Sequence, residues 1–256
     1  CASLRRMGAG SPAARALTGR ETSVPTLDRS VIAGLPPFEG LGPDDLDHIL
    51  ELARASRYPR ETAIFEQDAP AGHFFLLLDG HVRVVRITPE GEQIISRYIN
   101  AGEMFGLAVA MGRAAYPATA IAAVDCVVVA WPNSAWAELS RRFPSFGAST
   151  YRTIGKWLQE THARMLELVT AQVEQRVAHA LLRLAHQAGR KTPEGIEIDF
   201  PITRQDIAEM TATTLHTVSR LMSAWEEKGI VASGRQKVTI VDPHALMLIA
   251  EQRGRK

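Results

Sequence analysis

The stretch Ile202–Arg220 reads ITRQDIAEMTATTLHTVSR and predicts two short helices joined by a tight turn. Thr203 is a favourable N-cap residue, and Asp206 three positions later can bond back to it, as in a capping box. The run from Thr211 to Thr214 interrupts the apolar pattern with hydroxyl-bearing residues, which suit a turn and a second N-cap better than a helix interior. The apolar period then resumes and places one set of side chains on a common helix face: Val218, Leu221, Met222 and Trp225.

The other face of this second helix carries hydroxyl groups, one histidine and one arginine. The residues on that face or beside it are Thr214, His216, Thr217, Ser219 and Arg220. Hydroxyl groups reach phosphates, and an arginine can bind guanine O6 and N7 with two hydrogen bonds. The pattern therefore predicts a helix that lies in the major groove of double-stranded DNA. An ordinary pair of surface helices is the alternative interpretation.

The residues after the second helix favour DNA binding. Gly229 ends the helix, and Ile230-Val231 and Val238–Val241 read as two strands around Ser233-Gly234-Arg235. A helix pair followed by a hairpin with a basic tip is typical of a winged helix-turn-helix.

The composition of the whole chain limits the classes of protein to which it can belong. The chain has 256 residues, enough for two domains, and 46% hydrophobic with 22% charged residues is ordinary for a globular protein. The net charge of +1 does not decide the partner, because a DNA-binding protein needs only local positive charge. No run approaches the roughly 18 apolar residues that span a bilayer. We expect a cytoplasmic protein without a membrane partner, and a disordered, mildly basic arm over residues 1–30.

The chain has only two cysteines, Cys1 and Cys126. Two cysteines form no disulfide framework, which fits a reducing cytoplasm, and they exclude a four-thiolate iron–sulfur cluster within one chain. The sequence also lacks a His/Cys/carboxylate cluster with metal-ligand spacing, a Gly-rich phosphate loop and a nucleophile motif. We therefore expect no metal site and no enzyme activity.

Residues 31–143 have the pattern of a β domain with short helical ends. Pro43–Ala55 predicts a helix, and turn signals at Asp79-Gly80 and Pro89–Gly91 separate short apolar segments. The predicted strands are Ala63–Phe65, Phe74–Leu78, Val82–Ile87, Gln93–Ile99 and Ala118–Trp131. Short strands at this spacing predict a β-sandwich or a barrel-like roll.

Residues 144–170 predict one long helix with an apolar seam. Its positions step alternately by three and four, and they are Tyr151, Ile154, Leu158, Thr161, Met165 and Leu168, with Trp157 widening one end. Such a narrow seam favours a parallel homodimer, although a helix that packs on its own β domain remains an alternative. Residues 171–256 then form the DNA-binding domain. A supporting helix at Ala171–Ala188, a strand at Ile196–Phe200 and a closing helix at His244–Glu251 complete it.

The segment ITRQDIAEMTATTLHTVSR resembles the corresponding segment of the CRP/FNR family of bacterial transcription regulators. The phrases IFEQDAPAGHFFLLLDGHVRV and AGEMFG resemble the cyclic-nucleotide-binding-type β-roll that forms the sensor half of these proteins. The resemblance runs from about Phe38 to the end of the chain. It implies an α+β protein with an N-terminal jelly-roll sensor, a long dimerisation helix and a C-terminal winged helix-turn-helix. It also implies a homodimer that binds a two-fold symmetric operator and contacts RNA polymerase.

The resemblance assigns roles within the DNA interface. Thr203, Gln205 and Thr214 match phosphate-contacting residues, Arg220 matches the base-reading arginine, and Ser219 matches the serine of an E-x-x-S-R motif. His216 departs from the family, because both main branches place a glutamate there, and Leu215 replaces a second base-reading arginine. The operator should therefore differ from the familiar ones at those positions. The remaining interface residues are Arg204 and Thr217 in the helices and Arg235 and Lys237 in the wing.

The sensor half lacks the residues that bind a nucleotide in its relatives. Leu107 stands where those members have a glutamate, and Pro117-Ala118 where they have an Arg-Ser pair, so a cyclic nucleotide is not favoured. The chain looks more like the Dnr/NnrR-type branch, which responds to nitric oxide through haem. Haem is therefore the cofactor hypothesis, with a pocket formed by His73, Met104, Phe105, Leu107 and Met111. His81, the other histidine of the roll, is expected to be an exposed turn residue. The alternative functions are a cyclic-nucleotide-responsive regulator and a haem- or ligand-binding protein without DNA binding.

Overall fold

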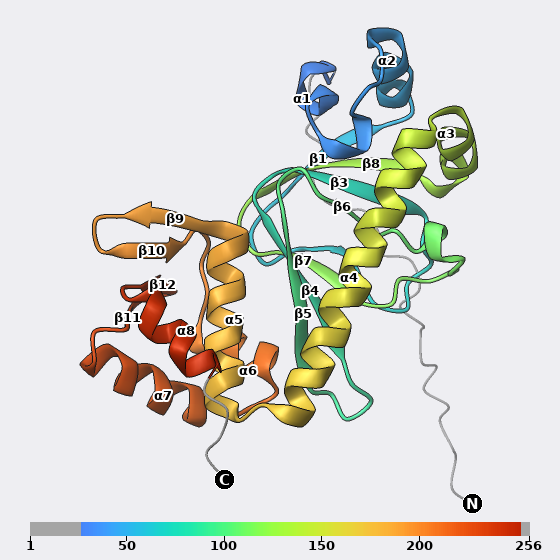
Figure 1. Ribbon diagram of the computed structural model, residues 1–256. Helices are drawn as coiled ribbons and strands as arrows, with labels where there is room; N and C mark the ends of the chain where they lie inside the picture. Colours follow the sequence, from blue (N-terminus) through green and yellow to red (C-terminus); the bar gives the residue numbers. More distant parts are fainter. Residues whose placement is uncertain (1–26, 252–256) are drawn as a thin grey trace, which may run out of the picture.

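The computed structural model describes residues 27–251, in which a β-roll is joined by one long helix to a smaller helical domain (Figure 1). The helices are α1 (Ser30–Ala33), α2 (Pro43–Glu51), α3 (Trp136–Arg142), α4 (Pro144–Thr170), α5 (Val173–Ala188), α6 (Arg204–Thr211), α7 (Leu215–Glu227) and α8 (Pro243–Glu251), with 3₁₀ turns η1 (Pro36–Phe38), η2 (Val109–Met111) and η3 (Asn133–Ala135). The predicted arm over residues 1–30 falls almost entirely outside the described residues. No helix of residues 27–251 is long and apolar enough to cross a membrane.

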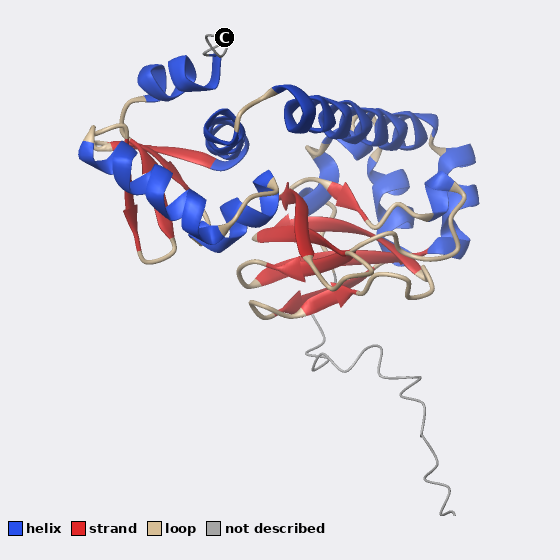
Figure 2. Cartoon of the chain, turned by 90° about the horizontal axis from the view of Figure 1, so that it is seen from below, coloured by secondary structure: helices blue, strands red, loops and turns tan. Residues whose placement is uncertain are grey.

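The β-roll consists of two four-stranded sheets packed face to face (Figure 2). One sheet has the order β1-β8-β3-β6, and its strands are Arg54–Tyr58, Cys126–Pro132, His73–Asp79 and Met104–Phe105. The other has the order β2-β7-β4-β5, and its strands are Ala63–Phe65, Thr119–Ala122, His81–Ile87 and Gln93–Asn100. Alternate residues of both sheets point inward, as the strand period of two requires, and Leu77, Val82 and Ile99 are almost fully buried between them. The predicted β-roll is confirmed.

Two predicted elements of the roll were wrong in their bounds. Ala118–Trp131 is not one strand but two, because the chain crosses from one sheet to the other at Ala123–Asp125. The backbone N–H of Arg60 donates to the Asp125 carboxylate at 2.9 Å and stabilises this crossing. The helix predicted at Pro43–Ala55 ends at Glu51, and β1 begins at Arg54. Because β1 is an edge strand of mixed polarity, its sequence carries little strand signal.

An aromatic layer joins the outer face of the roll to the helices. The rings of Phe74 and Trp131 stack with centroids 5.6 Å apart, and Phe146 at the start of α4 packs on Phe74. The Trp131 indole N–H donates to the backbone carbonyl of Ile49 in α2 at 2.8 Å. This layer fixes the first two turns of α4 on the roll.

The C-terminal domain packs α5, α6, α7 and α8 against a small sheet of order β11-β12-β10-β9. Its strands are Val231–Gly234, Lys237–Ile240, Gly195–Ile198 and Gly189–Thr192. The strand β9 was not predicted, because its residues GRKT are exposed and polar. The core of this domain continues into the roll, since Val85, Ile95 and Tyr98 belong to the same apolar cluster as Phe200 and Ile207.

Candidate nucleic-acid interface

The first helix of the predicted pair, α6, begins at a complete capping box. The Thr203 backbone N–H donates to the Asp206 carboxylate at 2.7 Å, and the Asp206 N–H donates to the Thr203 hydroxyl at 3.0 Å. The predicted cap is confirmed, and it satisfies backbone donors that the helix leaves without partners. The turn follows at Ala212, whose backbone is left-handed with φ 48°. This left-handed residue sets the angle between α6 and the next helix, α7 (Leu215–Glu227).

An arginine of α5 stabilises this turn. The Arg176 guanidinium donates to the backbone carbonyls of Thr211 at 3.1 Å and Ala212 at 3.4 Å. It thereby satisfies carbonyls that the end of α6 leaves without helical partners. No sequence pattern indicated this role, because Arg176 lies outside the helix pair and its partners are backbone atoms.

The second helix, α7, begins at Thr214 as predicted, since the Thr217 N–H donates to the Thr214 hydroxyl at 3.2 Å. Val218, Met222 and Trp225 are buried against the domain core. The opposite face is open: Thr214, His216 and Arg220 are exposed, Leu215 is 47% exposed, and Thr217 and Ser219 are half-buried. The structure therefore brings the residues predicted for base contact together on one exposed strip.

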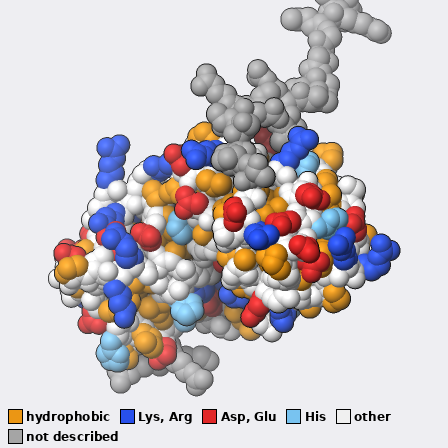
Figure 3. Space-filling model, turned by 90° about the horizontal axis from the view of Figure 1, so that it is seen from above, with side chains coloured by type: hydrophobic (Ala, Val, Ile, Leu, Met, Phe, Trp, Pro, Cys, Tyr) orange, Lys and Arg blue, Asp and Glu red, His pale blue; other side chains and the backbone are white. Residues whose placement is uncertain are grey.

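Three of the predicted contact residues have no protein partner within residues 27–251. These are Arg220, His216 and the wing residue Arg235, whose side chains make no hydrogen bond or ion pair in that part of the chain. An exposed and unpaired arginine keeps its hydrogen-bond donors free for a base edge or a phosphate. Acidic and basic side chains are interspersed on the face seen in Figure 3, so charge is not concentrated over that face.

Four other predicted contacts are engaged inside the domain. Arg204 forms an ion pair with Glu226 at 3.0 Å and donates to the Ser233 hydroxyl at 3.2 Å, which ties α6 to α7 and β11. Lys237 forms an ion pair with Glu197 of β10 at 2.6 Å. Lys237 and Arg190 together lower the pKa of the Glu197 carboxyl. In this arrangement Arg204 and Lys237 join elements of the domain, so their predicted DNA contacts, which stay a prediction, would compete with these ion pairs.

The other two engaged residues lie at the start of α6. The Thr203 hydroxyl donates to Asp206 at 2.7 Å while it accepts from the Asp206 N–H, and the Gln205 amide donates to Glu209 at 2.9 Å. The Gln205 bond joins exposed groups one helical turn apart, so it exchanges readily with other partners. The Thr203 hydroxyl is committed to the cap.

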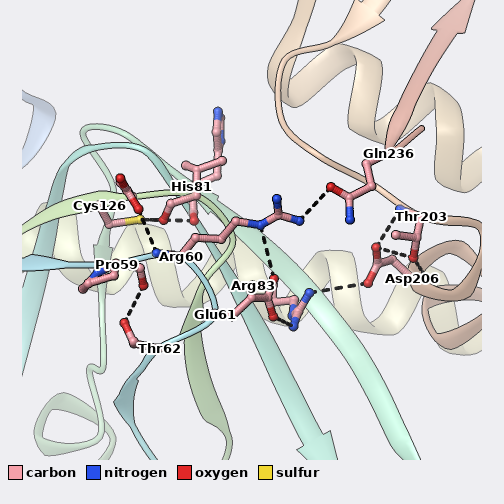
Figure 4. A network of polar contacts seen from close by, with 12 residues as sticks. Pro59, Arg60, Glu61, Thr62, His81, Arg83, Cys126, Thr203, Asp206 and Gln236 are labelled. Atoms are coloured by element: carbon pink, nitrogen blue, oxygen red, sulfur yellow. Dashed lines mark hydrogen bonds and ion pairs between the residues drawn. The ribbon is translucent and has the colours of Figure 1, made fainter. Parts of the chain in front are cut away.

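The start of α6 and the tip of the wing both contact the β-roll (Figure 4). Arg83 of β4 lies 3.6 Å from the Asp206 carboxylate and 2.6 Å from Glu61. Arg60 donates to the side-chain oxygen of Gln236 in the wing at 2.9 Å. Sequence analysis missed Arg60 and Arg83, because a surface arginine within a β-roll carries no sequence signal for a partner more than a hundred residues away.

Aromatic residues form the apolar part of this contact between domains. Phe200 lies 4.4 Å from the Tyr98 ring and 4.7 Å from the His81 ring, measured between centroids. Burial lowers the pKa of His81 and raises that of Tyr98, whose hydroxyl is buried without a partner in the described part of the chain. His81 is thus a half-buried residue of the domain contact, which corrects its prediction as an exposed turn residue.

The residues predicted to form an effector pocket do not converge. Met104 and Leu107 point into the apolar cluster that joins the roll to α2, α3 and α4, whereas Phe105 points between the two sheets. Met111 is 39% exposed. His73 begins β3, half-buried, and burial together with Arg54 lowers the pKa of its imidazole. The predicted pocket is therefore wrong as a set, because neighbouring strand residues such as Met104 and Phe105 face opposite sides of a sheet.

Aromatic side chains occupy the space between the sheets. Phe65 stacks on Tyr116 with centroids 3.9 Å apart, and Phe75 stacks on Phe105 at 5.2 Å. Gly106 has φ 64°, and a Cβ atom there would come within 2.6 Å of the Phe75 ring. These rings pack against one another between the sheets, beside Phe105, the predicted pocket residue that points there. Within residues 27–251 no three His, Cys, Asp or Glu side chains are grouped as metal ligands.

The long helix α4 divides its predicted seam between two faces. Tyr151, Leu158 and Met165 are 56%, 56% and 66% exposed, and Leu168 is 49% exposed. Leu166 and Val169, which the seam did not include, are 65% and 81% exposed. Ile154 and Trp157 are partly buried against the core of their own roll, as the alternative interpretation of this helix expects, and their place in a dimer interface stays a prediction. The predicted seam therefore includes residues of two faces of α4, one packed on the roll and one exposed in the described chain.

Comparisons with known proteins match both halves of the chain. Residues 55–143 match the family model for the cyclic nucleotide-binding domain, and residues 175–249 match that for the Crp-like helix-turn-helix domain. The "Cyclic AMP receptor protein" of Thermus thermophilus is 28% identical over 217 residues, which cover 85% of this chain and 97% of that protein. The "Transcriptional activator protein anr" of Pseudomonas aeruginosa is 24% identical over 208 residues, covering 81% and 85% of the two chains.

Solved structures agree with this assignment. The structure of FixK2 from Bradyrhizobium japonicum has the same fold, with a TM-score of 0.69 and 22% identity over 79% of this chain and 99% of that one. A CRP-family transcriptional regulator from Thermus thermophilus superimposes with a TM-score of 0.66 and 26% identity, covering 76% and 96%. With a cyclic-nucleotide-binding domain followed by a Crp-like helix-turn-helix, this chain belongs to the CRP/FNR family of transcription regulators.

Proposed function

We propose that the protein is a homodimeric regulator that places one α7 helix in each of two successive major grooves. The open strip of α7 carries this proposal, because Arg220 and His216 are exposed and unpaired within the described residues. The buried side of α7 is anchored by Trp225, whose indole N–H donates to Glu174 at 3.2 Å. A rigid helix with free donors on its outer face is suited to reading base edges.

The contacts divide into two classes. Arg220 pairs with guanine O6 and N7 and so reads sequence, whereas Thr214 and Thr217 at the start of α7 and Arg235 in the wing bind phosphates. His216 and Leu215 occupy the neighbouring positions on the same exposed strip. A neutral histidine can accept or donate one hydrogen bond, and leucine offers only apolar contact with a thymine methyl group. We therefore expect a half-site with a guanine opposite Arg220. The neighbouring base pairs, opposite His216 and Leu215, should be recognised by fewer hydrogen bonds and more apolar contact.

The dimer forms along the exposed face of α4. Its apolar residues Tyr151, Leu158, Met165 and Leu168 recur at helical spacing, and together they are too extensive to remain in water without cost. Thr161 lies in this face, but its hydroxyl donates to the Trp157 carbonyl at 2.8 Å, so burying it leaves no donor without a partner. Two α7 helices placed about 34 Å apart would then read a two-fold symmetric site.

The roll controls the DNA-binding domain through the contacts at Asp206 and Gln236. Because Arg83 and Arg60 hold the start of α6 and the tip of the wing, any shift of the roll changes the orientation of the helix pair. An effector that favours one arrangement of α4 and the roll would shift the population of DNA-competent dimers. We name no effector, because Leu107 stands where nucleotide-binding relatives have a glutamate and the predicted haem-pocket residues do not converge.

The experiment is selection of bound duplexes from a random pool, followed by affinity measurements on the selected operator. Arg220→Ala should weaken operator binding by about 5- to 150-fold per half-site, corresponding to about 1–3 kcal/mol for one bidentate contact. Binding to unrelated DNA should weaken much less. Lys228→Ala, an exposed residue beyond the end of α7, is the matched control and should bind like wild type.

The same measurements separate the alternative function. A regulator should lose affinity steeply as salt rises, because it displaces counterions from phosphates. A ligand-binding protein without DNA binding would enrich no sequence and show no salt-dependent affinity. Equal affinity of Arg220→Ala and wild type for the selected operator would refute the assignment of Arg220.

A further inference from the structure

Two extended residues, Ala171 and Gln172, connect the long helix α4 to α5 and the DNA-binding domain. Ala171 has φ −99° and ψ 143°, and Gln172 has φ −70° and ψ 159°, so neither residue continues a helix. Arg183 of α5 also pairs with Glu167 of α4 at 2.6 Å, but this ion pair does not reach the helix pair α6 and α7. The orientation of the helix pair relative to α4 therefore depends on what holds the two sides of this connection together.

The first turn of α5, directly after the connection, is bonded to the other helices of its domain. The Glu174 carboxylate accepts from the Trp225 indole N–H of α7 at 3.2 Å. The Gln175 side-chain amide donates to the backbone carbonyl of Ala250 in α8 at 3.3 Å. This turn is consequently fixed to α7 and α8, and the next residue, Arg176, projects from a rigid base.

Arg176 binds backbone carbonyls on both sides of the connection. Its Nη1 atom donates to the carbonyl of Ala171, at the end of α4, at 3.2 Å. Its Nε atom donates to the Thr211 carbonyl at 3.1 Å and its Nη2 atom to the Ala212 carbonyl at 3.4 Å, both in the turn between α6 and α7. A guanidinium group is planar and rigid, so it holds the three carbonyls in a fixed relation that a lysine amine cannot reproduce.

The two carbonyls in the turn control the conformation of Ala212. This residue is left-handed, with φ 48° and ψ 54°, a conformation that a residue other than glycine keeps only where its surroundings impose it. The Thr211 and Ala212 carbonyls belong to the peptide planes before and after Ala212, and the φ and ψ angles of Ala212 relate these planes. By binding both carbonyls, Arg176 fixes the direction in which α7 leaves the turn.

We propose that Arg176 is a positioning residue that couples the end of α4 to the direction of α7, and so determines which spacing of two half-sites a dimer accepts. The proposal rests on the proposed function, in which α4 carries the dimer contact and α7 reads the bases. One base pair more or less between the half-sites displaces them by about 3.4 Å along the DNA axis and about 35° around it. A dimer with fixed α7 helices should reject such a displacement.

Operators with one base pair added to or removed from their centre test this role. Wild type should bind the selected spacing at least about tenfold more tightly than either altered spacing. Arg176→Gln should reduce this ratio at least about threefold, a size typical of positions that couple two sites, while the bases preferred within each half-site stay the same. Lys228→Gln removes an equal charge from an exposed position after α7 and should keep the wild-type ratio.

A second substitution separates positioning from stabilisation of the turn. Glycine adopts positive φ without strain, so Ala212→Gly supports the turn without Arg176. The double variant Arg176→Gln/Ala212→Gly should recover the unfolding midpoint that Arg176→Gln loses, but not the spacing ratio, whereas Ala212→Gly alone should keep both. Recovery of the ratio in the double variant, or equal weakening by Arg176→Gln at all three spacings, would overturn the proposal. Arg176→Lys with a wild-type ratio would do the same, because it keeps the charge without the planar fork.

A measurement without DNA distinguishes failure of this proposal from failure of the proposed function. Nitroxide labels are placed at Arg152→Cys in α4 and Lys228→Cys after α7, with Cys1→Ser so that the buried Cys126 is the only other thiol. Labelled chains are diluted with unlabelled ones, and pulsed EPR gives the spread of distances within one chain. The spread should be wider in the double variant than in the single glycine variant.

If wild type selects no DNA but the spread widens in the double variant, the proposed function is wrong and the positioning role of Arg176 stands. If wild type binds its operator, but the spread and the spacing ratio are the same in both variants, the positioning role is wrong and the proposed function stands.

Discussion

The ion pair between Arg83 and Asp206 connects the β-roll to the first helix of the DNA-binding pair, and substitution of Asp206 measures its strength. Asp206 has two roles: it accepts from the Thr203 N–H at 2.7 Å in the capping box, and it lies 3.6 Å from the Arg83 guanidinium. Its side chain is 11% exposed and that of Arg83 is 16% exposed, so solvent screens the pair only weakly. The two roles can be separated by two substitutions at the same position.

Asp206→Asn keeps an oxygen that accepts from Thr203 but removes the charge, whereas Asp206→Ala removes both. Loss of an N-terminal cap costs about 1 kcal/mol of unfolding free energy, and we expect about 1–2 kcal/mol from the ion pair. Asp206→Asn should therefore lose about 1–2 kcal/mol and Asp206→Ala about 2–3 kcal/mol. For a chain of this size, the larger loss lowers Tm by roughly 5–10 °C.

The assay is chemical and thermal unfolding of four proteins: wild type, Asp206→Asn, Arg83→Gln and the double variant. Asp206→Asn should cost much less in the Arg83→Gln background than in wild type, because its charged partner is already gone. A difference between the two backgrounds below about 0.5 kcal/mol would refute the reasoning, since distant and independent sites are additive to within that margin.

Three further predictions concern the dimer, the domain contact and the roll. Leu158→Glu should convert the dimer to monomers in analytical ultracentrifugation, because it places charge in the exposed seam of α4, whereas Arg152→Glu at an exposed polar position of the same helix should not. Burial lowers the pKa of His81 below that of the unfolded chain, so the unfolded state binds the proton more readily; stability should be full above about pH 6.5 and decline as the pH falls through the lower folded-state value. In denaturation curves measured from pH 8 to pH 5, His81→Gln should decline less than wild type, and an identical decline would contradict this role. Gly106→Ala should lower the unfolding free energy by more than about 1 kcal/mol in urea denaturation, since φ is positive and the new Cβ meets the Phe75 ring, whereas Gly155→Ala, which meets nothing within 4 Å on α4, should not destabilise the protein.

The sequence determined the features that depend on local patterns. The capping box at Thr203–Asp206 and the N-cap at Thr214 were predictable, because a cap is defined by residue types three positions apart. The same is true of the buried face of α7, of the wing hairpin and of the strands of the roll other than β1 and β6, because their periodicity follows from helix and strand geometry. The resemblance to a known family then supplied the order of the domains.

The tertiary structure alone decided which side chains are free and which are already paired. Arg204 and Arg220 are both predicted DNA contacts in the sequence, yet Arg204 is bound to Glu226 whereas Arg220 has no partner in residues 27–251. Two adjacent residues of the predicted pocket also point apart, since Met104 and Phe105 face opposite sides of β6, a strand that the sequence pattern did not predict. Contacts such as Arg83 with Asp206 join residues far apart in the chain. No local pattern encodes them, because they depend on how two separately folded domains pack together.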